Sequence, residues 1–209
     1  MEGGGSSIYL SDIGDYRNLD DLYGIATSSL FTLTLSLIAT RIGNLGGLSL
    51  NTYFDIFGIE AVLANTALIT LIFQLARYFY TVLYAKADKS WSPFVFICAL
   101  VVIQILHDIL FYHGVINLLP SGKNDMIDVL KQYAKENSTP AIGAHSALII
   151  ITALVAMIIN DMDNISKVVL LGIILYTLPY ILSIVYKKPA PPPPPPKKKE
   201  EMQDRRGFY

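Results

Sequence analysis

Five long apolar segments alternate with short polar stretches along the 209-residue chain. A helix needs about 20 mostly apolar residues to cross about 30 Å of hydrocarbon, and each segment reaches that length. With turn residues and charges as boundaries, the pattern predicts spans at 22–42, 58–85, 92–118, 140–160 and 165–186. We therefore expect an all-α fold: a multi-pass transmembrane helical bundle over 22–186, preceded by an extramembrane segment, 1–21.

A shorter amphipathic pattern lies between the third and fourth spans. Residues 120–122, Pro-Ser-Gly, interrupt the helix, and Asn124 or Asp125 can cap a new one. Apolar residues then recur at helical spacing, at Met126, Ile127, Leu130, Tyr133 and Ala134. One apolar face and one charged face predict an interfacial helix over 124–136, in the plane of the membrane surface or in a partner groove. Pro140 is expected to restart the chain into the fourth span.

The last apolar span is followed by a proline-rich C-terminal tail, 187–209. Six consecutive prolines favour polyproline II, so Pro189 to Pro196 form a semi-rigid spacer of about 25 Å. Basic and aromatic residues beyond the spacer form a plausible docking peptide. The candidate partner-binding residues of the tail are Pro191, Pro196, Lys197, Lys198, Lys199, Arg205, Arg206, Phe208 and Tyr209.

The distribution of lysine and arginine predicts the orientation. With five spans, one side of the membrane carries Arg41, Lys123, Lys131, Lys135, Lys187, Lys188, Lys197, Lys198, Lys199, Arg205 and Arg206, whereas the other carries Arg17, Lys86, Lys89 and Lys167. Cytosolic segments hold the excess of positive residues, so the tail is expected to be cytosolic. The N-terminal segment, with four aspartates, is then lumenal or external.

The composition narrows the classes of function. Hydrophobic residues make up 53% of the chain and charged residues only 16%, with a mean hydropathy of +0.46, which excludes an ordinary soluble domain. The lipid bilayer is therefore the first partner. A net charge of −1 predicts no nucleic-acid partner, and the single Cys98 supports neither a disulfide framework nor a thiolate metal site. No basic segment precedes an apolar run at the N-terminus, so the first span is expected to act as its own insertion signal.

Polar residues inside the spans are candidates for function by default. Arg77 is followed by an aromatic belt, which places it near an interface, where it can snorkel or pair with another helix, Asp108 included. Glu60 lies at the N-terminal end of the second span, where its charge suits the helix dipole. Hydroxyl residues of the first span recur every four positions and are expected to pack on a neighbouring helix. They are Ser28, Thr32, Ser36 and Thr40.

His107 and Asp108, followed by His113, form the densest polar group. A metal site or a proton relay is the functional alternative to an interfacial structural role. The spacing favours the structural role, because neither His107 and His113 nor Asp108 and His113 stack at i, i+4 on one helical face. No phosphate-binding loop, nucleophile elbow or His-Glu-x-x-His motif occurs. We therefore expect no enzyme, no catalytic or metal-ligating residues and no cofactor.

Three stretches, HDILFY, LPSGKNDMIDVLKQYAKE and PAIGAHSALII, resemble small multi-pass membrane proteins of the large nucleocytoplasmic DNA viruses. The resemblance covers about residues 55–185. His145-Ser146 depart from the family pattern, which has Asp-Ser there. The residues that carry the resemblance are His107-Asp108, Phe111-Tyr112, the turn Pro120-Ser121-Gly122-Lys123-Asn124, and Asp128, Lys131, Tyr133 and Ala134.

The resemblance implies a structural component of the membrane beneath an icosahedral capsid. Its expected partners are the major or minor capsid proteins, with other virion membrane proteins as further candidates. Its expected location is the virion inner membrane, reached through a membrane of the endoplasmic-reticulum type. Three alternatives stay open: the tail lysines as a polybasic lipid patch, the prolines as a ligand for a host SH3-like or profilin-like domain, and a small channel or transporter.

Overall fold

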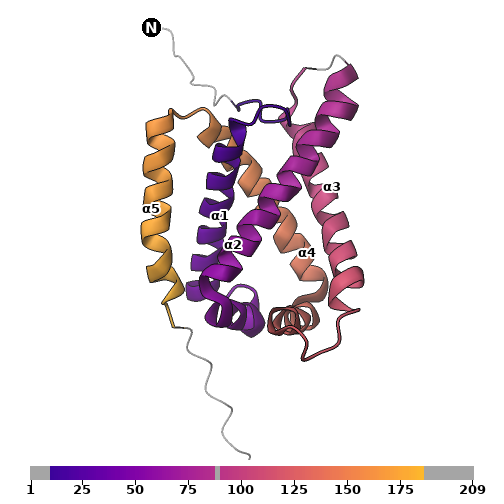
Figure 1. The fold of residues 1–209 in the computed structure, drawn as a ribbon, viewed down its shortest axis with the longest axis vertical. Helices are drawn as coiled ribbons and strands as arrows, with labels where there is room; N and C mark the ends of the chain where they lie inside the picture. Colours follow the sequence, from indigo (N-terminus) through magenta and orange to yellow (C-terminus); the bar gives the residue numbers. More distant parts are fainter. Residues whose placement is uncertain (1–9, 88–89, 186–209) are drawn as a thin grey trace, which may run out of the picture.

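The computed structural model describes residues 10–87 and 90–185 and is helical through most of them (Figure 1). Five of its helices are long and apolar enough to cross a membrane, which confirms the predicted fold class. The helices are α1 (Asp21–Gly43), α2 (Gly47–Phe79), α3 (Pro93–Phe111), α4 (Asp125–Asn160) and α5 (Asn164–Leu182), with π-helical turns at Tyr80–Tyr84 and Tyr112–Ile116 and a 3-10 turn at Ala85–Ala87.

An odd number of crossings separates the two ends of the described chain. Figure 1 shows α1 beginning at the top of the bundle and α5 ending at the bottom. We call these the N-terminal side and the tail side. The loop between α4 and α5 lies on the N-terminal side, and the loop between α3 and α4 lies on the tail side.

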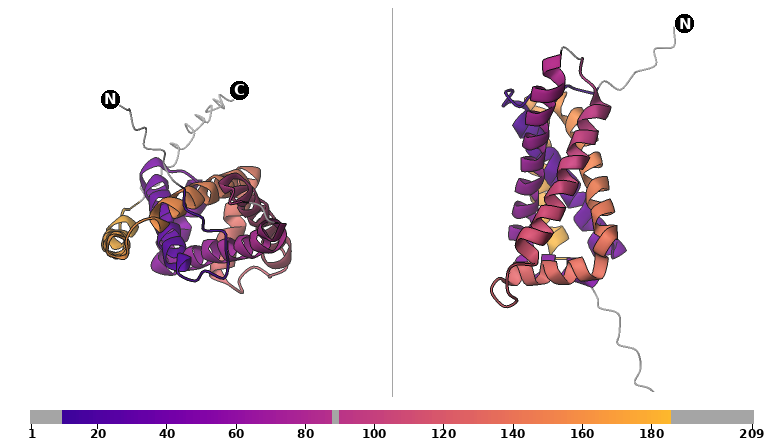
Figure 2. Two further views of the ribbon diagram at one scale, coloured as in Figure 1. Left: turned by 90° about the horizontal axis from the view of Figure 1, so that it is seen from above. Right: turned by 90° about the vertical axis from the view of Figure 1, so that its right-hand side faces the viewer.

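Helix α1 packs against α2, α4 and α5, while α3 packs against α2 and α4 (Figure 2). Two apolar clusters fill the interior. The first lies toward the N-terminal side and includes Ile25, Phe73, Phe96 and Met157. The second lies toward the tail side and is made by Leu30, Leu33, Leu37, Tyr53, Phe54, Ala61, Val62, Val129, Ile174 and Leu178. Helix α5 therefore reaches the core mainly through its contact with α1.

The predicted hydroxyl stripe of the first span lies on the buried side of α1. Ser28, Thr32 and Thr40 are buried, and Ser36 is half-buried. Thr32 Oγ1 lies 2.7 Å from Thr152 Oγ1 of α4, and Ser28 Oγ donates to the carbonyl of Gly24 within the helix. Small hydroxyl side chains let the two backbones approach closely, as expected for helices that pack in lipid.

The second span has an additional helical segment before it. Gly58 adopts φ 45° and ψ −117° inside α2, a conformation that side chains strongly disfavour, and the helix changes direction there. The predicted span 58–85 corresponds to the part after this kink. Residues 47–57, which lie outside the predicted spans, form a helix on the tail side (Figure 1).

The predicted surface helix 124–136 and the span 140–160 form one continuous helix, α4, with Pro140 inside it. This differs from the expected restart at Pro140. Proline lacks an N–H and removes one helical hydrogen bond, which bends a helix without ending it when the flanking turns continue. Figure 2 shows the first part of α4 lying across the tail side and the rest rising through the bundle. As expected, Asn124 caps the helix, accepting from the Ile127 N–H at 3.0 Å.

Candidate functional site

Two helical segments on the tail side form a surface that we call the platform: residues 47–57 of α2 and residues 125–137 of α4. Glu136 joins them, because its carboxylate accepts from the N–H groups of Leu48 and Ser49 at 3.1 and 2.9 Å. These are first-turn donors of α2, whose N-cap residue Gly46 has no side chain to cap them. Hydrogen bonding from the Ser49 side chain, and then from its backbone, holds the pKa of Glu136 below its ordinary value.

The apolar face of residues 125–137 is turned toward the bundle. Val129 and Tyr133 are buried, and Met126 packs against the tail-side cluster. Tyr53, from the other platform segment, packs on Phe54 and Phe57 and accepts from Asn65 Nδ2 at 3.2 Å. The platform is thus anchored to the spans by buried side chains, and its charged residues are left at the surface.

Arg41 connects the platform to the end of the last span. Its guanidinium is fully buried and donates to Asp55 Oδ1 at 2.6 Å and to Asn51 Oδ1 at 3.3 Å. It also donates to the carbonyl oxygen of Leu182, the last residue of α5, at 3.5 Å. One side chain therefore links the end of α1, the first platform segment and the point where the chain leaves α5.

A second polar cluster joins α3 and α4. Asp108 accepts from Gln104 Nε2 at 2.5 Å, and it lies 3.2 Å from His107 Nδ1 and 2.8 Å from His145 Nδ1. Ser146 donates to Gln104 Oε1 at 2.9 Å. The Asp108 carboxylate thus bridges two imidazoles, and the pair His145 and Asp108 ties the two helices together.

The arrangement of this cluster differs from a metal centre. One carboxylate contacts both histidines, and the Tyr133 ring stacks on His145 with the centroids 6.3 Å apart. Within residues 10–87 and 90–185, no group of three or more His, Cys, Asp and Glu side chains could hold a metal ion. The chemistry that these contacts support is hydrogen bonding between helices.

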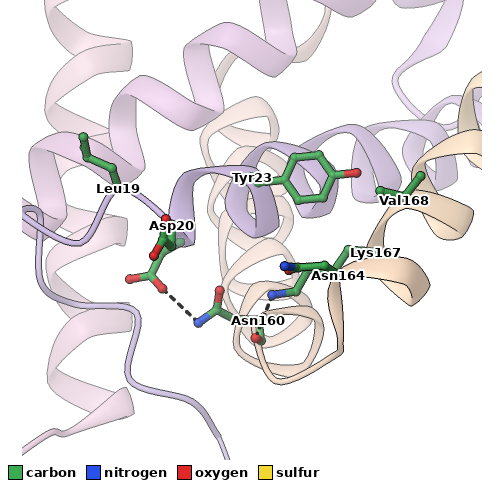
Figure 3. A pocket seen from close by; sticks show the side chains of 8 residues that line it. Leu19, Asp20, Tyr23, Asn160, Asn164, Lys167 and Val168 are labelled. Atoms are coloured by element: carbon green, nitrogen blue, oxygen red, sulfur yellow. Dashed lines mark hydrogen bonds between the residues drawn. The ribbon is translucent and has the colours of Figure 1, made fainter.

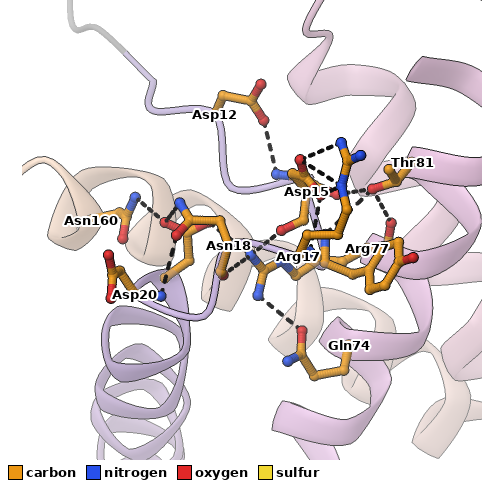
Figure 4. A network of polar contacts seen from close by, with 12 residues as sticks. Asp12, Asp15, Arg17, Asn18, Asp20, Gln74, Arg77, Thr81 and Asn160 are labelled. Carbon is orange, nitrogen blue, oxygen red and sulfur yellow. Dashed lines mark hydrogen bonds and ion pairs between the residues drawn. The ribbon is translucent and has the colours of Figure 1, made fainter. Parts of the chain in front are cut away.

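Arg77 lies on the opposite, N-terminal side and neither snorkels nor pairs with Asp108. Its side chain is fully buried, donating to Asp21 Oδ2 at 2.8 Å, to the Asn18 carbonyl at 2.7 Å and to the Asp15 carbonyl (Figure 4). Gln74 accepts from its other terminal nitrogen at 2.9 Å. The segment 10–20, predicted as extramembrane, therefore closes the end of the bundle over a buried cation.

Neighbouring contacts hold that segment in place. Thr81 Oγ1 donates to the Gly14 carbonyl at 3.0 Å, and Trp91 Nε1 donates to the Leu10 carbonyl at 3.3 Å. A methyl group added at Gly14 would meet Trp91 at 2.7 Å and Tyr80 at 2.8 Å, so only glycine fits this position without rearrangement. The aromatic belt predicted to mark an interface also holds the N-terminal segment.

A hollow of about 600 Å³ opens on the same side, where α1 and α5 begin and α4 ends (Figure 3). Its walls include Asp20, Tyr23, Asn160, Asn164 and Lys167. Asn160 donates to Asp21 Oδ1 at 3.0 Å, and Lys167 Nζ donates to the Asn160 carbonyl at 2.9 Å. A second hollow, between α1 and α2, is mostly apolar.

The remaining candidate residues are not brought together. Glu60 is exposed in the first turn after the Gly58 kink, apart from the His107 cluster and from Arg77. The tail candidates, from Pro191 to Tyr209, lie outside the described residues. The sequence analysis did not predict that His145 pairs with Asp108 or that Arg41 joins the platform to the end of α5. Both are polar residues inside apolar segments, and that signal was available, but their partners lie on other helices.

The chain was compared with family models, with curated proteins and with solved structures, and none of them matches it.

Proposed function

We propose that this chain is a structural membrane protein of a large icosahedral DNA virus. The bundle anchors it in the virion inner membrane, and the C-terminal tail tethers that membrane to the capsid shell. The proposal rests on the sequence resemblance and on one structural observation, the contact of Arg41 with Leu182 and the platform. The bilayer and the major or minor capsid proteins are its partners.

The contact matters because a tether needs a defined point of attachment. Arg41 contacts Asn51, Asp55 and the Leu182 carbonyl, so the described chain leaves α5 beside a surface segment that is anchored in the bundle. From there the spacer Pro189 to Pro196 sets a reach of about 25 Å above the membrane. A defined start and a semi-rigid spacer together specify a distance, which is what a link between two concentric shells requires.

Truncation after Lys188 tests the proposal in infected cells. We expect the truncated protein to enter the host membrane normally but to be depleted from purified particles, or to leave capsids separated from the membrane. A matched control replaces Lys197, Lys198 and Lys199 by glutamine and keeps the spacer and the terminal peptide. Normal incorporation of the truncated protein into normal particles would refute the tether.

Binding experiments with the tail alone, read together with the truncation, separate the rival uses of the tail. A tail-only peptide that binds anionic vesicles, with binding lost in the glutamine control, would indicate a polybasic lipid patch instead. Binding to an SH3-like or profilin-like domain that requires the prolines, with particles unaffected by truncation, would indicate a host-directed ligand.

A further inference from the structure

The hollow lined by Asp20, Tyr23, Asn160, Asn164 and Lys167 is placed at the depth of lipid headgroups. Asp21 is the first residue of α1, Asn160 is the last of α4, and Asn164 is the first of α5. Since these three helices have the length and apolarity of membrane spans, their ends mark the edge of the hydrocarbon layer. Tyr23 at the rim suits that boundary, and exposed Leu19 and Val168 flank the hollow.

One cation, Lys167, and two carboxylates, Asp20 and Asp21, line the hollow. Lys167 and Asn164 come from α5, whereas Asp20 comes from the start of α1 (Figure 3). The Lys167 ammonium has three donor hydrogens, and among the described residues it makes one hydrogen bond, to the Asn160 carbonyl. Its side chain is held at the wall, with only 8% of the residue exposed, and two donors are left for a ligand.

Asp20 supplies an acceptor that the fold does not use. It occupies the N-cap position of α1, but its side chain caps no N–H there and makes no other hydrogen bond in the described part of the chain. The adjacent Asp21 is already engaged by Arg77, Asn18 and Asn160. The hollow therefore offers one unused carboxylate opposite one partly used ammonium.

We propose that this hollow binds the zwitterionic headgroup of an ethanolamine phospholipid. The phosphate accepts from Lys167 and from the Asn164 amide, and the ethanolamine ammonium donates to Asp20. A purely anionic headgroup would face the Asp20 carboxylate without compensation, and a choline headgroup has no N–H to donate. The proposal is independent of the capsid role, because it concerns the side of the membrane away from the tail.

Lipid binding to the full chain in a non-ionic detergent tests this inference. Phosphatidylethanolamine, phosphatidylcholine and phosphatidylglycerol with identical acyl chains are added, and retained lipid is measured by native mass spectrometry. We expect the ethanolamine lipid to bind about tenfold more tightly than the other two, the difference that one charge-assisted hydrogen bond confers. Equal retention of the three lipids would overturn the proposal.

Substitutions of the residues proposed to bind the phosphate and the ammonium test whether the lipid preference arises in this hollow. Lys167→Met and Asp20→Asn should each abolish the preference for ethanolamine, whereas Lys86→Gln and Asp161→Asn, on the same side but outside the hollow, should keep it. Asp20 is exposed and its side chain makes no hydrogen bond among the described residues, so Asp20→Asn is decisive even if Lys167→Met misfolds. An Asp20→Asn protein that keeps the preference would refute the site. Displacement of lipid by equimolar soluble phosphoethanolamine would assign the hollow to the free compound and overturn the lipid proposal.

Discussion

The Arg77 guanidinium and the Asp21 carboxylate lie 2.8 Å apart, although 56 residues separate them in the chain. Both side chains are buried, and Asp21 also accepts from Asn18 and Asn160. A buried charge that loses its partner keeps its desolvation cost and has nothing to offset it. The pair therefore connects α1, α2, α4 and the N-terminal segment, and its integrity should govern the stability of that end of the bundle.

Asp21→Asn should destabilise the bundle by about 3 to 5 kcal/mol, because it leaves the Arg77 cation buried without a counter-charge. The free energy of unfolding can be measured by titration with a denaturing detergent in mixed micelles. Asp20→Asn is the matched control and should change stability little, since Asp20 is exposed. The double variant Asp21→Leu with Arg77→Met should cost less than the sum of the single changes. Additive costs would contradict a direct pairing.

The platform should weaken in acid through Glu136. Hydrogen bonding from Ser49 lowers the pKa of the Glu136 carboxylate below its ordinary value of 4.5. The ionised carboxylate therefore stabilises the fold fully when the pH is above 4.5, and this stabilisation is lost as the pH falls below 4.5 and the group becomes protonated. We expect wild type to be more stable than Glu136→Gln at pH 7, with the difference narrowing toward pH 3. Glu60→Gln, which changes an exposed carboxylate of α2, is the control. A difference that is independent of pH would contradict this role.

Gly58→Ala should destabilise α2 by about 1 to 3 kcal/mol, because φ 45° with ψ −117° is strained for any residue with a Cβ. The cost is conformational, since a Cβ there would have open space around it. Gly143→Ala is the matched control, as its Cβ also meets nothing and its φ is ordinary. Equal stability of the two variants would show that the kink is not maintained by Gly58.

His145→Leu should cost about 1 to 3 kcal/mol, because it removes the hydrogen-bond partner that α4 supplies to the Asp108 carboxylate. Replacing both, Asp108→Leu with His145→Leu, should recover part of that loss, since no carboxylate is then left under-bonded. Unfolding in mixed micelles checks both variants. A double variant that is less stable than the sum of the singles would contradict the proposed pairing.

The orientation can be tested with single cysteines in a Cys98→Ser background. Ser121 lies on the tail side and Asp161 on the N-terminal side, and both are exposed. With the tail side cytosolic, a membrane-impermeant maleimide added to sealed microsomes should label Ser121→Cys and spare Asp161→Cys. The reverse pattern would refute the orientation drawn from the lysine and arginine distribution.

The span boundaries were predictable because the thickness of the hydrocarbon layer fixes the length of an apolar segment. The first span was predicted at 22–42 and is Asp21–Gly43, and the third was predicted at 92–118 and is Pro93–Ile116. The platform segment 47–57 was not predicted. Its apolar residues run directly into the second span, and Gly58 alone gives no indication of which direction the helix takes.

The polar clusters were harder to predict, because their partners lie on different helices. Arg77 was expected to snorkel or to pair with another helix, Asp108 included, whereas the packing of α1 against α2 brings it to Asp21. His107 and His113 do not stack on one face of a helix, so their spacing is unsuitable for a pair of metal ligands. The contact that forms, between Asp108 and His145, joins two different helices, so no periodicity within one segment indicates it.

The packing of α5 on α1 has a consequence for biosynthesis. Of the five helices, α1 comes first in the described chain and α5 last, so their contact forms only after α5 has been synthesised. Thr32 and Asp21 of α1 likewise bond to Thr152 and Asn160 of α4, which are also synthesised later. Contacts so distant in sequence close late. During synthesis α1 can therefore pack on α2 well before it packs on α4 and α5, and the buried side of α1 is completed last.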